Sequence, residues 1–196
     1  MLVTELEIQV VEAEIQAMID RETAAWDTQD AEALVDLFHP DMVWPWPPDA
    51  QAHDPSTWIF PYGRYNRDRW RAEWQSLFET HALVHNRRAT VKITLSAEGD
   101  GAFAVVDVDT LWRDEAGRDF HWLGRAGKGY TRVDGEWKLI MHTGLLQYPG
   151  GENQATGRGR LHHDGKQAQA EEATTGRQGS RDFHVLGRTW SVSLSL

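Results

Sequence analysis

The chain has 196 residues, with 20 Lys and Arg against 30 Asp and Glu, and it contains no cysteine. A chain of this length can bury a core without disulfides, and the lack of cysteine excludes thiol catalysis and cysteine-ligated zinc. A formal net charge of −10 disfavours nucleic acid and membrane partners, and no apolar run is long enough for a spanning helix, so a cytoplasmic location is expected.

The composition divides the chain near Tyr148. Residues 1–148 contain every tryptophan except Trp190 and are expected to form one domain. Residues 149–196 are polar and rich in glycine, with little apolar surface to bury, so we expect this tail to be mostly disordered. The weakly alternating stretch 183–196 could add an edge strand or pair with another subunit.

Three helices are expected first, because apolar residues recur there at spacings of three and four. They fall within 4–28, within 31–38 and within about 66–80; Asp30 caps the second, and Pro40 ends it. Between the second and third helices, the prolines of 45–48 exclude a helix, so 42–46 should be a short strand that runs into a loop.

The rest of the domain has the period of two that is typical of strands. Four segments separated by Gly- and Asp-containing turns predict an antiparallel meander; they are 84–96, 102–113, 120–133 and 136–147. Three helices followed by a curved antiparallel sheet give an α+β fold in which the helices cover one face of the sheet. Such a cone is the expected place for a small-molecule site.

A series of short motifs falls in a fixed order along this plan. Gly63 precedes the third helix, Val84-His85 opens the meander, Gly99-Asp100 makes its first turn, and an Asp-Gly-Glu-Trp turn at 134–137 makes its last. In this order the chain resembles the nuclear transport factor two-like superfamily, whose members include SnoaL-like polyketide cyclases, ketosteroid isomerase, scytalone dehydratase and the association domain of calmodulin-dependent kinase II. The resemblance covers residues 10–147 and implies a cone-shaped α+β barrel, commonly a homodimer through the convex sheet face.

The superfamily hosts several activities, so the matching positions decide which one is expected. Trp46 and Glu22 stand where ketosteroid isomerases place their catalytic Asp and Tyr, which disfavours that mechanism. The positions that match scytalone dehydratase read Trp26-Asp27 and Val84-His85. The resemblance therefore implies His85 as a general acid and base oriented by Asp27, in an isomerisation, dehydration or cyclisation that needs no cofactor. Asp27 could instead be an exposed residue of the last helical turn.

A cation in the cone would favour a ligand that carries an anionic or carbonyl oxygen. Strand parity counted from Asp134 places Lys128 inside, whereas a bulge at one of the strand's glycines would bring in Arg125 instead. His142, on the last strand, could face either the cavity or a dimer interface. Several tryptophans are expected to line the cavity for a hydrophobic small molecule, among them Trp26, Trp44, Trp46 and Trp112.

Asp107 and Asp109 alternate with the apolar face of their strand. The superfamily lines its cavity with the face that ends at an aromatic residue, which here looks like Trp112, so the resemblance implies that both acids lie on the convex face, and we expect no metal there. The competing hypothesis for the whole chain is a non-catalytic ligand-binding or oligomerisation module in which the same residues have structural roles.

Overall fold

The computed structural model describes residues 4–47, 54–146, 181–185 and 188–192. Helix α1 (Glu5–Asp27) starts with a capping box, in which the Thr4 hydroxyl accepts from the Glu7 amide and the Glu7 carboxylate accepts from Thr4. Helix α2 (Ala31–Asp36) is capped by Asp30, as expected, and α3 (Arg67–Thr80) is capped by Asn66. A short 3-10 helix, η1 (Pro55–Thr57), precedes α3.

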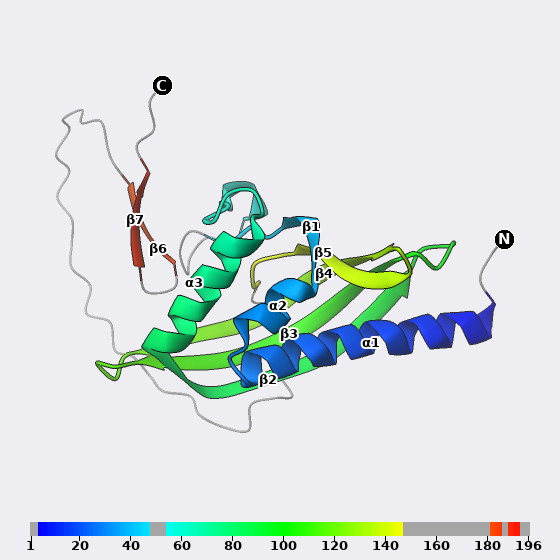
Figure 1. Cartoon of the computed structure of the whole chain (residues 1–196), viewed down its shortest axis with the longest axis horizontal. Coiled ribbons are helices and arrows are strands. Elements are labelled where there is room, and N and C mark those ends of the chain that lie inside the picture. The colour runs from blue at the N-terminus through cyan, green and yellow to red at the C-terminus, as the bar shows by residue number, and fades with distance from the viewer. Residues whose placement is uncertain (1–3, 48–53, 147–180, 186–187, 193–196) are drawn as a thin grey trace.

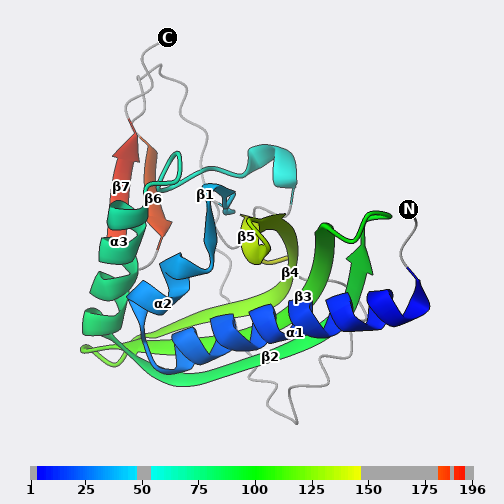
Figure 2. The same cartoon turned by 45° about the vertical axis from the view of Figure 1, so that its right-hand side comes forward.

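The five-stranded sheet contains the expected antiparallel meander, β2 (His81–Leu95), β3 (Gly101–Asp114), β4 (Asp119–Val133) and β5 (Glu136–His142). The strand order is β1-β5-β4-β3-β2, because the short strand β1 (Phe38–Val43) joins the edge of the meander parallel to β5. The sheet curves strongly, and α1 runs along its length on one side (Figures 1 and 2). This is the expected α+β cone.

The expected end of the second helix was wrong. Phe38 and Pro40 belong to β1, whereas α2 already ends at Asp36. Proline is tolerated here because β1 is an edge strand that is paired to β5 only at its two ends, with an irregular register between Phe38 and Val43.

The inner face of the sheet and the helices enclose an aromatic core. Trp112 and Ala126 on the sheet are fully buried, as are Ile15 and Leu34 on the helices. The opposite face of the sheet carries exposed apolar side chains, including Phe103, which is 61 % exposed. The two faces of the sheet therefore differ in burial, as expected for a sheet that helices cover on one side.

Most of the tail 149–196 lies outside the described residues, so the expectation of disorder stays a prediction. The described part forms β6 (Arg181–Val185) and β7 (Arg188–Val192), which pair with each other in a separate antiparallel sheet. Within the described ranges, no helix combines the length and the apolar character needed to cross a lipid bilayer.

Candidate functional site

A cluster of four ionisable side chains lies buried between α1 and the sheet. Glu22 on α1 forms an ion pair with Lys128 on β4, and its other carboxylate oxygen lies 2.9 Å from Arg88 Nη1 on β2. His142 on β5 lies with Nε2 3.9 Å from Glu22 Oε1. All four side chains are less than 5 % exposed. Below they are called the buried cluster.

Burial and mutual charge decide how the buried cluster is protonated. Burial alone would raise the pKa of Glu22, but the charges of Lys128 and Arg88 lower it well below its usual range. Burial lowers the pKa of Lys128 to about 8, against the opposing effect of Glu22. Burial and the charge of Lys128 lower the pKa of His142 to about 3. At pH 7 the cluster therefore contains one carboxylate, two cations and a neutral imidazole, a net charge of +1.

A β-bulge turns His142 toward this cluster. Its strand alternates regularly from Trp137 to Leu139, and the pairing with β4 then shifts by one residue, so that His142 lies opposite Lys128. The ring stacks on Trp44 with the ring centroids 4.0 Å apart. Nδ1 donates a 2.6 Å hydrogen bond to the carbonyl oxygen of Thr143, so in the neutral ring Nε2 carries the lone pair.

Hydrogen bonds connect the buried cluster to the end of α1. Arg88 Nε donates to Asn86 Oδ1 at 3.1 Å, and Thr110 donates to the same oxygen at 2.7 Å. The amide nitrogen of Asn86 in turn donates to Asp27 Oδ1 at 2.9 Å. Asp27 is exposed, so this network runs from the interior to solvent.

Tryptophan rings surround the buried cluster. Trp26 is packed against Trp74, Trp112 and Trp122 at centroid distances of 5.0 to 6.3 Å, and the Arg88 guanidinium lies 5.6 Å from its ring centroid. In the described part of the chain, several buried donors have no hydrogen-bond acceptor: the indole N–H groups of Trp44, Trp70, Trp74, Trp112 and Trp122, and the Tyr130 hydroxyl. Buried donors are rarely left without an acceptor, so this set needs an explanation.

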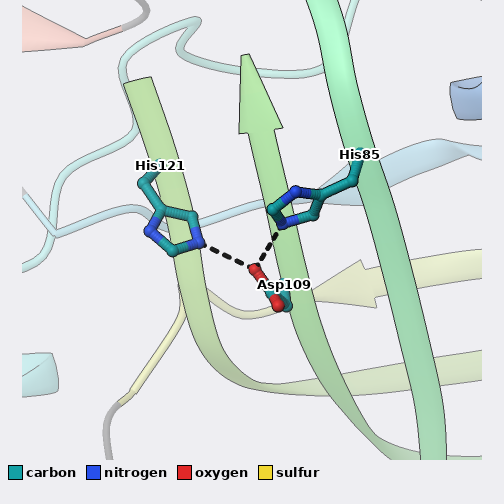
Figure 3. Close-up of side chains that lie close together, drawn as sticks. All are labelled: His85, Asp109 and His121. Carbon is teal, nitrogen blue, oxygen red and sulfur yellow. Dashed lines mark hydrogen bonds and ion pairs between the residues drawn. The ribbon is translucent and has the colours of Figure 1, made fainter. Parts of the chain in front are cut away.

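The structure does not bring Asp27 and His85 together. Adjacent residues of a strand point to opposite faces, and it is Asn86 that faces inward to Asp27. His85 points to the outer face, where its Nε2 lies 2.8 Å from Asp109 Oδ1 (Figure 3). The expected catalytic pair is thus replaced by two separate contacts, and the His85 side chain does not enter the interior.

The two candidate cations lie on opposite faces of β4. Lys128 is fully buried in the interior, whereas Arg125 forms a bidentate pair with Asp107 on the outer face, at 2.5 and 2.9 Å. Gly124, next to Arg125, has a φ of +152°, and a Cβ there would lie 2.9 Å from the carbonyl oxygen of Leu146. This glycine allows the close approach of another backbone segment without reversing the strand parity.

The tryptophans chosen from the sequence lie in or beside the aromatic core. Trp26, Trp44 and Trp112 are buried, and Trp46 is partly buried, with its ring 5.9 Å from that of Trp44. Sequence reasoning gave no role to Glu22 and Arg88. Glu22 interrupts the apolar stripe of α1 one turn after Met18 and one turn before Trp26, and a charge inside such a stripe is the signal that could have identified it.

A pocket of about 640 Å³ lies beside β1, and no residue of the buried cluster lines it. Its lining consists of Asp41, Met42, Val43, Phe60, Gly63 and Arg64. Arg64 and Asp41 lie 3.7 Å apart there and are both strongly exposed. The pocket contains no buried ionisable group, so the buried cluster remains the stronger candidate site.

Comparison with known proteins identifies the fold. A family model described as SnoaL-like domain matches residues 16–140, and no curated protein matches the chain. A ketosteroid isomerase-like protein from Erwinia carotovora atroseptica is 16% identical, with 69% of this chain and 96% of that chain covered, at a TM-score of 0.52. A candidate scytalone dehydratase from Novosphingobium aromaticivorans is 17% identical, with 71% and 86% covered, at a TM-score of 0.55.

A candidate aromatic ring hydroxylase, also from Novosphingobium aromaticivorans, is 21% identical, with 69% of this chain and 89% of that chain covered, at a TM-score of 0.52. Similarity at these identities shows the nuclear transport factor two-like cone fold and does not transfer an activity.

Proposed function

The chain belongs to the SnoaL-like domain family, and we propose that its tryptophan-rich interior binds a hydrophobic small molecule that carries a carboxylate or a carbonyl oxygen. The observation that carries the proposal is the net charge of +1 on the buried cluster, next to buried donors that have no acceptor. A ligand with an apolar ring and an acceptor oxygen would satisfy both features.

The chemistry of the cluster favours an oxygen ligand beside Lys128. Glu22 already neutralises one cation, and the second cation lacks a buried counter-ion among the described residues of the cluster. An isolated buried charge is costly, so an anion at this place would gain more than the same anion at the surface. Rings of tryptophan would stack on the apolar part of the ligand.

A calorimetric comparison of two ligands with the same ring tests this proposal. We expect 2-naphthoate to bind the full-length protein at least about tenfold more tightly than 2-naphthamide, the range expected for a hydrogen bond to a charged group. The preference should weaken as the pH rises through about 8, where Lys128 loses its proton. Equal affinity for the two ligands at pH 7 would show that the cluster does not select an anion, and the absence of binding of both ligands would contradict the proposal.

Substitution assigns the effect to a residue. Lys128→Met should abolish the preference for the carboxylate, whereas Arg125→Met removes a cation of the outer face and should preserve it. If both variants lose the preference equally, the preference for the carboxylate comes from the net charge of the protein and not from Lys128 in the interior.

Proton transfer is the second candidate function, and one observation favours it. His142 presents an unprotonated Nε2 3.9 Å from Glu22 Oε1 and lies opposite Lys128 on the neighbouring strand, an arrangement in which a base could remove a proton next to a carbonyl while Lys128 stabilises the oxygen. A base with a pKa of about 3 is weak, however, so binding is the better supported function. A His142→Gln variant that retains naphthoate binding but loses deuterium exchange into a bound ketone would distinguish the two.

A further inference from the structure

A second group of ionisable side chains lies on the outer face of the sheet, on three neighbouring strands. His85 on β2 and His121 on β4 both lie across from Leu111 on β3, and Asp109 is two residues before Leu111 on the same face. The register therefore brings two imidazoles and one carboxylate to a single point, as Figure 3 shows. None of these residues belongs to the buried cluster.

The two imidazoles converge on one carboxylate oxygen. His85 Nε2 lies 2.8 Å and His121 Nε2 2.7 Å from Asp109 Oδ1, and the three candidate ligand atoms lie within 4.8 Å of one another. In a tetrahedral zinc site, metal–ligand distances of about 2.0 Å place neighbouring ligand atoms about 3.3 Å apart. Small rotations of two exposed or half-exposed rings would open that space, with no change in the backbone.

In the triad of His85, Asp109 and His121, one side chain is buried and two are accessible. The Asp109 side chain is 5 % exposed, that of His85 25 % and that of His121 43 %. Both histidines donate hydrogen bonds to the Asp109 carboxylate and hold it in place. The carboxylate is thus fixed in the sheet, and in the single chain the open side of the triad faces outward.

We propose that His85, Asp109 and His121 bind a divalent transition-metal ion of the zinc class. Two imidazole nitrogens and one carboxylate oxygen suit Zn²⁺ or Co²⁺, whereas Mg²⁺ and Ca²⁺ prefer oxygen ligands alone. Three protein ligands leave at least one coordination position for water, which distinguishes this site from a closed structural one. No metal was expected here from the sequence, in which Asp109 was considered together with Asp107, and His85 together with Asp27.

Arg87 is the residue that opposes the proposal. Its Nη1 lies 3.8 Å from Asp109 Oδ2 and would repel a cation. Its side chain is 56 % exposed, so it can turn toward solvent when a metal binds. Arg87→Gln should therefore bind the metal more tightly than the wild type.

Calorimetric titration of the full-length, untagged protein with ZnCl₂ and with MgCl₂ tests the site. We expect one Zn²⁺ per chain, no comparable binding of Mg²⁺, and a loss of at least about tenfold in Zn²⁺ affinity in each of His85→Ala and His121→Ala. Both histidines are accessible, so these variants should fold, and Asp109→Asn tests the buried ligand with little change of shape. The control is His162→Ala combined with His163→Ala, a histidine pair elsewhere in the sequence.

Two results would overturn the proposal. One is wild-type Zn²⁺ binding weaker than about 1 mM. The other is binding that survives in His85→Ala and His121→Ala but disappears in the His162 and His163 control, because the histidines of the triad would then form only a hydrogen-bonded group with Asp109.

Discussion

Acid sensitivity of the fold follows from the burial of a neutral His142. Burial and Lys128 lower its pKa in the folded protein to about 3, whereas a histidine in the unfolded chain titrates near 6.5. Between these values the unfolded chain binds the proton more readily, so this contribution to stability is complete above pH 6.5 and is lost as the pH falls toward 3. From pH 6.5 to pH 5 the interval is about 1.5 units, and about 1.36 kcal/mol per unit gives a loss of about 2 kcal/mol.

Urea unfolding followed by tryptophan fluorescence at pH 7 and pH 5 measures this loss. The stabilisation that the Glu22 carboxylate provides changes little between pH 7 and pH 5, because both pH values lie above the pKa of about 4.5 that this group has in the unfolded chain. His142→Phe keeps an aromatic ring against Trp44 and removes the titration, so it should lose about 2 kcal/mol less than the wild type between the two pH values. The same loss in the wild type and in His142→Phe would contradict this prediction, and His39→Phe, which changes a histidine outside the buried cluster, is the control.

Three further predictions concern the cluster, the strand glycines and the outer face. Lys128→Met should lower the free energy of unfolding by about 3 kcal/mol or more, because it leaves the buried Glu22 carboxylate with one partner fewer. Arg125→Met should lower it by no more than about 1 kcal/mol. Similar losses for the two variants in urea unfolding would contradict a larger contribution of the interior pair. Gly124→Ala should lower the free energy of unfolding by about 1–3 kcal/mol, through backbone strain and contact with Leu146. Gly127→Ala, whose Cβ would lie 3.5 Å from Thr143, should lower it less. Equal decreases in melting temperature for the two variants would contradict the close approach of Leu146 to Gly124. We expect light scattering to give a mass near twice 22.3 kDa, as for a dimer formed through the convex face of the sheet. Phe103→Asp, on that face, should produce a monomer, whereas Phe60→Asp should not. A wild-type monomer at high concentration would contradict a dimer interface on the convex face.

Strand parity and helix periodicity predicted most of the fold and part of the site. The alternation of β3 put Trp112 on one face and Asp107 and Asp109 on the other, and the resemblance to the superfamily assigned the Trp112 face to the interior. Parity counted from Asp134 placed Lys128 inward, as the structure has it. These features depend on local patterns with periods of two or 3.6 residues, which the sequence displays directly.

Contacts that depend on register could not be predicted in the same way. The bulge before Met141 reverses the parity of the end of β5 and turns His142 inward, and no local signal marks it. The pairing of β2 with β3 decides whether His85 or Asn86 faces α1, and a shift of one residue exchanges them. The resemblance to scytalone dehydratase implied a pair of Asp27 and His85, whereas in the structure Asp27 contacts Asn86 and His85 contacts Asp109.

The proton affinity of Lys128 in the presence of a ligand tests the interior site most directly. NMR titration of the Lys128 ammonium should give a pKa near 8 in the free protein. A carboxylate bound beside it favours the charged form, so saturation with 2-naphthoate should raise this pKa, while 2-naphthamide should leave it nearly unchanged. A pKa that is the same in the free protein and in both mixtures would contradict the account, because the ligand would then bind away from the buried cluster.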